Sequence, residues 1–528
     1  MIWVDREVNK LKDRKLPLEW VDDMKTPSGR IHVGALRGVL IHDLMYKALF
    51  DNDVKVKYTY VFNDFDQMDA VPTFLEYSKW QEHEGKPLFH VPSPEPGFAS
   101  FAEYFAKEFI NVFESINCHP EIIWSSKLYL TGKMNTVIKE ILDAGPAVRK
   151  IYAEVTKAHK PDNWYPFQAI CENCGKIATT VTYDWDGKHV YYHCQPHLVK
   201  WTKGCDHKGK VTPYDGHGKL HWRLDWPAHW KVIGVTIEGS GKDHMSSGGS
   251  YDFAKAVCEQ VLKIPTPYAI PYEWFTVGGR KMSSSKGIGT TAKDITEILP
   301  PDVLRFLIVR TPIGTALDFN PYGETIPRLF DDYDRCLNAH FDVIENKTPD
   351  GKMGEVTRDF ARIMKLSEVR PLPDKRLYIP RFRTLVNLIK NNSDLVAFTK
   401  KQKGEDLNSE EKEILEEREI YAQKYIKEYE TQKDPAHHNK SLNDAVILTS
   451  QQKEFLKNLV NELKKTAESG AEHFQTLVFS TIKVSGLKPK EAFSAIYFVL
   501  TGEKHGPKVG ELIASMTKEK TIEKLTAA

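Results

Sequence analysis

The stretch KTPSGRIHVGA, residues 25–35, joins a strand pattern to a helical pattern and decides how the N-terminal part of the chain folds. Residues 18–25 (LEWVDDMK) are typical of a short strand, and apolar residues recur at helical spacing over 31–50. A second strand candidate covers 55–63. Strand, helix and strand in this order predict a right-handed βαβ unit and a parallel sheet.

The rest of the chain divides by its pattern. Helix and strand candidates alternate again at 230–239, 251–262 and 272–279, whereas the cysteine- and glycine-containing stretch between them interrupts the rhythm as an insertion. Beyond about residue 310 long polar helices dominate, and Thr449 with Gln452 fits a capping box at the start of one of them. We therefore expect a Rossmann-type α/β catalytic domain in two halves (1–125 and 216–310), an inserted zinc-containing module (126–215), a helical connecting domain (311–440) and a helical C-terminal domain (441–528).

Bulk composition excludes some classes of protein. The 528 residues are 41% hydrophobic and 27% charged, as in soluble globular proteins, and the formal net charge is +1. The overall charge therefore does not indicate a nucleic-acid partner. The sequence shows neither a membrane-spanning apolar run nor a signal-peptide pattern at its start, so a cytoplasmic protein is expected.

His32 follows a turn and precedes the helical pattern. The free N–H groups of a helix start attract phosphate, and a histidine beside them adds a donor. Gly34 lacks a side chain and would let a flat base approach the backbone. An ordinary helix start that happens to carry a histidine is the alternative.

The stretch KMSSSKG, residues 281–287, combines two lysines, three hydroxyls and a glycine after the strand candidate at 272–279. Such a loop suits phosphate, because positioned cations stabilise the charge that builds up during nucleotidyl transfer. A basic, serine-rich surface loop is the alternative. Both stretches in this order are far more specific than either one.

Four of the seven cysteines cluster, as Cys171-Glu-Asn-Cys174 followed by Cys194 and Cys205. A C-x₂-C pair with two later cysteines predicts a closed, tetrahedral structural Zn²⁺ site. A redox pair or unrelated thiols are the alternatives. Because the second half of the cysteine pattern is C-x₁₀-C and not another C-x₂-C, His193, His197 or His207 could replace one cysteine.

Aromatic and acidic residues suggest a pocket for a cation. The stretch 221–230 contains Trp222, Asp225, Trp226 and Trp230, and tryptophan faces hold cations. Asp243 and His244 follow a strand candidate, as do Asp64 and Asp66, and ligands of open α/β sheets bind at strand ends. For any single tryptophan a packed core position is the more common role. The stretch GSGKDH does not have the spacing of a P-loop.

Together with GKDHMSSGGS (241–250) and LTGEKHGP (500–507), the two signatures make the chain resemble the class I lysyl-tRNA synthetases over nearly its full length. The resemblance implies ATP-dependent attachment of L-lysine to tRNA(Lys) through a lysyl-adenylate, with Mg²⁺ accompanying ATP and with a monomer acting away from membranes. It implies catalytic roles for His32, Lys281 and Lys286, ATP contacts by Pro27, Ser28, His32, Gly34, Lys281, Met282, Ser283, Ser284 and Lys286, and lysine contacts by Gly29, Trp222, Asp243, His244 and Tyr272.

Two positions depart from the class signatures. Ala35 stands where His or Asn is usual, and Ser284 replaces the second lysine of K-M-S-K-S. Lys286 would supply the missing charge from a shifted place.

The C-terminal helices resemble the anticodon-binding part of the family, and Phe479, Tyr497 and Phe498 would be available to stack bases, although their spacing equally fits a buried core. Two other functions stay open at this point: a small-molecule nucleotidyltransferase, and a catalytically inactive, zinc-containing tRNA-binding paralogue.

Overall fold

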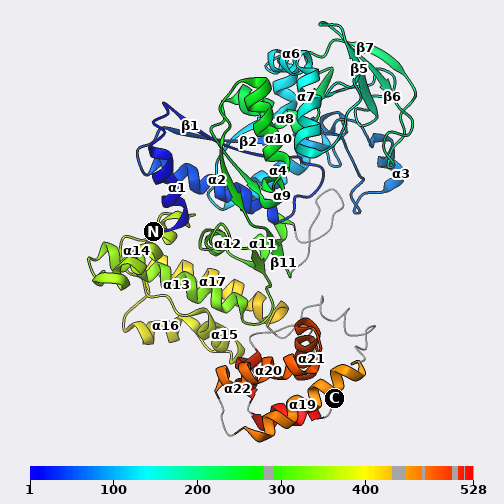
Figure 1. Cartoon of the computed structure of the whole chain (residues 1–528). Helices are drawn as coiled ribbons and strands as arrows, with labels where there is room; N and C mark the ends of the chain where they lie inside the picture. The colour runs from blue at the N-terminus through cyan, green and yellow to red at the C-terminus, as the bar shows by residue number, and fades with distance from the viewer. Residues whose placement is uncertain (279–290, 431–447, 467–469, 502–508, 517, 527–528) are drawn as a thin grey trace. The chain divides into compact units, whose positions relative to one another are not determined.

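The computed structural model describes residues 1–278, 291–430, 448–466, 470–501, 509–516 and 518–526 (Figure 1). By its internal contacts the chain divides into two units, Met1–Lys433 and Asp434–Ala528.

A five-stranded parallel sheet organises the first unit. Its order is β10-β9-β1-β2-β3, with β1 (Glu19–Lys25) in the centre, β2 (Val56–Phe62) and β3 (Glu121–Trp124) on one side, and β9 (Ile237–Gly241) and β10 (Tyr268–Tyr272) on the other. All four pairings are parallel. The chain therefore winds away from β1 in both directions, which leaves a crevice at the carboxyl ends of β1 and β9 where open α/β sheets bind ligands.

Helices cover both faces of this sheet, and alternate residues of a strand therefore enter different cores. Tyr58, Tyr60 and Phe62 of β2 pack in one core, whereas Val61 packs in the other. The first core is completed by α1 (Trp3–Lys12), α2 (Gly34–Phe50), α4 (Phe101–Ser115) and α12 (Pro301–Val309). The second is completed by α6 (Asn135–Asp143), α7 (Gly145–Ile151), α8 (Trp222–Ile233) and α10 (Ser250–Val257). The α/β fold with a parallel sheet is thus confirmed.

Shorter elements fill the chain between β3 and β9. They are α5 (Ser125–Leu130), β4 (Phe167–Ala169), β5 (Thr180–Trp185), β6 (Val190–Cys194), β7 (Lys208–Val211) and β8 (Gly218–Leu220). β4 pairs with β8, and β5, β6 and β7 form an antiparallel sheet of their own. Figure 1 shows β5, β6 and β7 together with the helices α6 and α7. Residues 230–233, which lie within the apolar run 230–239, still belong to α8, so β9 begins only at Ile237.

The remainder of the first unit is mostly helical. It contains α3 (Tyr77–Trp80), α9 (Lys242–Met245), α11 (Ala292–Ile298), α13 (Thr325–Ile344), α14 (Gly351–Leu366), α15 (Phe382–Lys390), α16 (Leu395–Lys403) and α17 (Ser409–Glu428). A parallel pair, β11 (Phe275–Val277) and β12 (Leu317–Phe319), lies beside α2. None of the described helices is long and apolar enough to cross a membrane.

Among its described residues the second unit contains helices and no strand. The helices are α19 (Ser450–Lys465), α20 (Ala471–Ser485), α21 (Pro489–Thr501), α22 (Val509–Met516) and α23 (Lys518–Thr526). The predicted capping box at Thr449 is confirmed: its hydroxyl accepts from Gln452 N–H at 3.2 Å, and the Gln452 side chain accepts from Thr449 N–H at 3.1 Å. The core of the second unit includes Phe455, Leu459, Val478 and Ile496.

Candidate active site

A cavity of about 390 Å³ lies at the carboxyl ends of β1, β9 and β10. Its position is the one that the strand order predicts for a ligand site. The lining residues are Asp23, Met24, Lys25, Thr26, His32, Gly34, Ala35, Tyr60, Asn63, Asp66, Trp222, Trp226, Glu238, Gly239, Ser240, Gly241, Asp243, His244, Tyr272 and Trp274.

The stretch around His32 forms one wall of the cavity. His32 pairs as an isolated bridge with Thr291, and Ala292 N–H donates to the carbonyl of Ile31 at 2.8 Å. A Cβ on Gly34 would meet His32 Nδ1 at 2.8 Å and the Phe275 carbonyl at 3.0 Å. Gly34 is therefore required here by the packing of the His32 ring and of β11 against the helix start, before any ligand is considered.

Burial, together with the nearby charge of Lys25, lowers the pKa of His32 to about 4. His32 is therefore neutral at pH 7. A neutral imidazole offers a phosphate oxygen one N–H donor and no full positive charge. His32 therefore supplies no cationic stabilisation at neutral pH.

The second signature lies outside the described residues, and with it the predicted Lys281, Met282, Ser283, Ser284 and Lys286. Described residues before and after the second signature lie next to the first signature. Phe275 of β11 contacts the Gly34 position, and Thr291 pairs with His32. The two signatures, far apart in the sequence, thus have their neighbouring residues at the same wall.

Acidic residues form the floor of the cavity. Asp23 of β1 and Glu238 of β9 line it, and Asp22, the strand partner of Glu238, is buried and accepts from the Thr59 hydroxyl. Burial raises the pKa of all three carboxyl groups, and their mutual repulsion raises the pKa of Asp22 and Glu238 further. A buried carboxylate cluster of this kind is stabilised by an incoming cation.

Tryptophans and a histidine line the side wall. Trp222 stacks on Trp226 with ring centroids 5.6 Å apart, and the His244 ring meets Trp222 edge-on at 5.5 Å. Trp226 also donates from its indole N–H to Glu238 at 3.3 Å. Trp222 remains 40% exposed, so its face is available to a ligand. Aromatic faces beside carboxylates suit an alkyl ammonium.

The structure brings most of the predicted amino-acid-binding residues together. Trp222, Asp243, His244 and Tyr272 line the cavity. Pro27, Ser28 and Gly29 lie in the adjoining loop and are not among the residues that line it.

Three other candidates face elsewhere. Asp64 accepts from the backbone N–H and the hydroxyl of Ser126, Asp225 pairs with Lys219 at 2.9 Å, and Trp230 is a core residue that donates to Glu238 at 2.9 Å. None of the three is among the residues that line the cavity. Asp225 and Trp230 lie on the buried face of α8, and Asp64 follows β2 and is held by Ser126.

Sequence reasoning missed Asp23, Lys25 and Glu238. Asp23 and Lys25 stand in the strand that precedes the first signature, and polar residues inside a central strand are a signal that was present. Glu238 carried no comparable signal, since only the adjacency of β9 and β1 brings it to Asp23.

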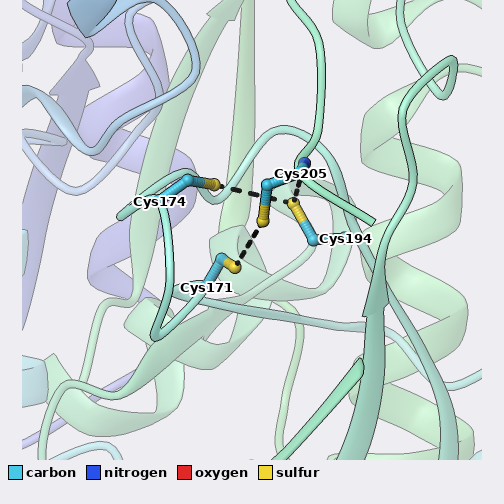
Figure 2. Close-up of side chains that lie close together, drawn as sticks. All are labelled: Cys171, Cys174, Cys194 and Cys205. Atoms are coloured by element: carbon cyan, nitrogen blue, oxygen red, sulfur yellow. Dashed lines mark hydrogen bonds between the residues drawn. The ribbon is translucent and has the colours of Figure 1, made fainter. Parts of the chain in front are cut away.

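The four predicted cysteines meet at one point, as Figure 2 shows. All four sulfurs lie within 4.8 Å of one another. The Cys171 and Cys205 sulfurs are 3.6 Å apart, and those of Cys174 and Cys194 are 3.7 Å apart. A tetrahedron of sulfurs at the usual Zn–S distance of about 2.3 Å has edges of about 3.8 Å. The donor set and its spacing therefore fit Zn²⁺.

In the second unit the predicted aromatic residues lie in different environments. Phe479 is 50% exposed and meets Phe493 edge-on at 5.3 Å, whereas Tyr497 is buried in the core. Phe498 is partly buried against the same core.

Known proteins match this chain over nearly its full length. Residues 1–370 match the family described as tRNA synthetases class I (K), and residues 401–528 match the anticodon binding domain. A lysine–tRNA ligase of Methanosarcina barkeri is 33% identical, covering 95% of this chain and 93% of its own. A lysine–tRNA ligase of Methanocaldococcus jannaschii is 31% identical, covering 99% of both chains.

Among solved structures, a glutamate tRNA ligase from Elizabethkingia meningosepticum covers 96% of this chain and 98% of its own at 12% identity, with a TM-score of 0.32, which is too low to support an inference. The match of the family model over most of the chain and the full-length relatives are sufficient. The chain belongs to the class I lysyl-tRNA synthetase family.

Proposed function

We propose that this chain activates L-lysine with ATP to lysyl-adenylate and diphosphate, and then transfers the lysyl group to tRNA(Lys) with release of AMP. The lysine–tRNA ligases that match it over nearly the full chain support this reaction, as does the anticodon binding domain at residues 401–528. The cytoplasm, where such relatives would charge tRNA, is the proposed place of action.

The acidic floor of the cavity is the observation that carries the choice of lysine. A buried ammonium needs a carboxylate, because an unpaired buried charge is costly. Asp23 and Glu238 supply two carboxylates within the lining, and the buried Asp22 is the strand partner of Glu238. The ε-ammonium group of lysine would lower the pKa of these raised carboxyl groups by pairing with them.

The aromatic wall would hold the alkyl chain of lysine. Trp222 and His244 present apolar faces at the rim, and Tyr272 closes the opposite side near Asp23. A side chain without the terminal ammonium would leave the carboxylates unpaired, which is how hydrogen-bonding pockets discriminate strongly.

ATP would lie along the wall formed by His32 and Gly34, beside the Pro27–Ser28 turn, with Lys281, Met282, Ser283, Ser284 and Lys286 reaching it from the second signature. His32 would donate one N–H to phosphate, since it is neutral. Lys281 and Lys286 would supply the positive charge that stabilises the departing diphosphate. Mg²⁺ would accompany ATP and bind mainly its phosphate oxygens and water.

We further propose that Cys171, Cys174, Cys194 and Cys205 hold a structural Zn²⁺. Sulfur spacing and the burial of Cys171 and Cys194 support this proposal. Four thiolates leave no open position, so the metal would brace short strands that have little core of their own.

Lysine-dependent exchange of labelled pyrophosphate into ATP, measured with and without tRNA(Lys), tests the function. Exchange that needs lysine, in at least one of the two conditions, is expected. Exchange that needs neither lysine nor tRNA would favour a small-molecule nucleotidyltransferase. An absence of exchange in both conditions would favour an inactive tRNA-binding protein.

A further inference from the structure

A fully buried lysine lies next to the cavity without lining it. Lys219, in the middle of β8, is 1% exposed. Its Nζ donates to Asp66 Oδ1 at 2.6 Å and to Asn63 Oδ1 at 3.2 Å, and lies 2.9 Å from Asp225 Oδ2. Lys219 therefore joins β8 to the loop that follows β2.

The two carboxylates on Lys219 have different surroundings. Asp225 is 1% exposed and also accepts from the Tyr129 hydroxyl at 2.6 Å, so it belongs to the packed interior. Asp66 is 21% exposed and lines the cavity. The charge of Lys219 is thus shared between a structural carboxylate and one that faces the ligand site.

Burial by itself lowers the pKa of Lys219, but the charges of Asp225 and Asp66 raise it more, so that the ammonium stays charged. A buried ion pair of this kind adds little stability compared with apolar packing, because both charges lose their hydration. Its effect is mainly directional: it holds each carboxylate in one place.

Asp66 connects Lys219 to the residue that precedes the first ATP signature. Its other oxygen, Oδ2, accepts from the Thr26 hydroxyl at 2.5 Å. Thr26 is the residue between β1 and the PSGRIHVGA stretch, and it lines the same cavity. Lys219, Asp66 and Thr26 form one continuous chain of polar contacts that ends at the start of the loop leading to His32.

We propose that Lys219 is a positioning residue for the bound nucleotide: through Asp66 it fixes Thr26, and thereby the loop that carries the first ATP signature. This role rests on the proposed function, because it assigns the nucleotide to that loop. Catalytic geometry is sensitive to such restraints, since a displacement of about 1 Å costs roughly 100-fold in rate.

Thr26→Val tests the link with the least disturbance, because it removes the hydroxyl and keeps the shape. We expect kcat/KM for ATP in lysine-dependent pyrophosphate exchange to fall about tenfold. KM for lysine is expected to change less than twofold, and Thr26→Ser should restore the rate. Thr236→Val is the matched control: it removes a hydroxyl that donates to Glu19 at the amino end of β9, away from the cavity.

A double-mutant cycle tests Lys219 itself. If Lys219 acts through Asp66 and Thr26, adding Thr26→Val to Lys219→Met should lower kcat/KM for ATP less than twofold further. Should Lys219→Met fail to fold, Asp66→Asn, which removes the carboxylate in the middle of the same chain, takes its place in the cycle.

Either of two results would overturn the assignment. One is a kcat/KM for ATP of Thr26→Val within twofold of the wild-type value. The other is a double variant in which the effects of Lys219→Met and Thr26→Val on kcat/KM multiply. A wild-type protein without lysine-dependent exchange would instead contradict the proposed function, so the two failures are distinguishable.

Discussion

Replacing Asp23 by Asn is the sharpest perturbation of the lysine pocket. The change keeps the size of the side chain and removes one negative charge from the cavity floor, where Asp23 is 8% exposed. The side chain accepts from the Met24 N–H at 2.8 Å, and the amide oxygen of Asn can accept the same bond, while the pairing of β1 with β2 uses main-chain groups.

The expected magnitude follows from Coulomb's law. Two unit charges about 4 Å apart interact by about 4 kcal/mol at an effective dielectric constant of about 20, which corresponds to roughly 1000-fold in affinity. Glu238 and Asp22 remain and retain part of the attraction. We therefore expect kcat/KM for lysine to fall between about 30-fold and 1000-fold.

The assay is steady-state aminoacylation of tRNA(Lys) with lysine or ATP as the varied substrate. KM for ATP in Asp23→Asn should stay within about threefold of the wild-type value, since we propose that the phosphates bind at the His32 wall. Asp51→Asn, which removes a charge paired with Arg362 at the end of α2, is the control and should leave both constants unchanged. A fall in kcat/KM for lysine of less than fivefold in Asp23→Asn would refute the reasoning.

Three further predictions concern the histidine wall, its glycine and the cysteines. The pKa of His32 is about 4 in the folded protein against 6.5 in the unfolded chain, so the unfolded chain binds the proton first and stability is lost as pH falls from 6.5 to 4. In urea unfolding, His32→Gln should reduce this loss of stability by up to about 3 kcal/mol. The same pH profile in the variant and the wild type would contradict the lowered pKa of His32. Gly34→Ala places a Cβ 2.8 Å from the His32 ring and should lower kcat for exchange at least tenfold with a lysine KM near wild type, so equal kcat values would be inconsistent with the packing. Elemental analysis should find one zinc per chain, and Cys174→Ser or strong chelation should release it and lower the thermal midpoint; metal-free protein of undiminished midpoint would exclude a structural zinc.

Much of the fold was predictable because local periodicity and burial coincide. The strand at 18–25 and the helix after PSGRIHVGA were predicted within a few residues of β1 and α2. The helix is buried on nearly all sides, since it is enclosed between the sheet and the helices α1 and α12, and its apolar residues recur every three to four positions. The cysteine cluster was predicted because ligand spacing in a C-x₂-C pair is local.

The floor of the site was not predictable in the same way. Asp23 and Glu238 become neighbours only because β9 pairs with β1, and strand order is a property of the whole fold. Trp222, Trp226 and Trp230 follow one another at helical spacing, yet the last of them lies in the core. Periodicity identifies the face of a helix, but it does not show where along that face a cavity ends.

The most direct test of the central claim is to identify the amino acid that the protein attaches to tRNA. Purified protein would be incubated with ATP, Mg²⁺, tRNA(Lys) and all twenty amino acids together, and the aminoacyl-adenosine released by ribonuclease would be identified by mass spectrometry. An acidic cavity floor beneath an aromatic wall predicts lysyl-adenosine as the dominant product. A different aminoacyl-adenosine, or uncharged tRNA from folded and zinc-loaded protein, would contradict the account.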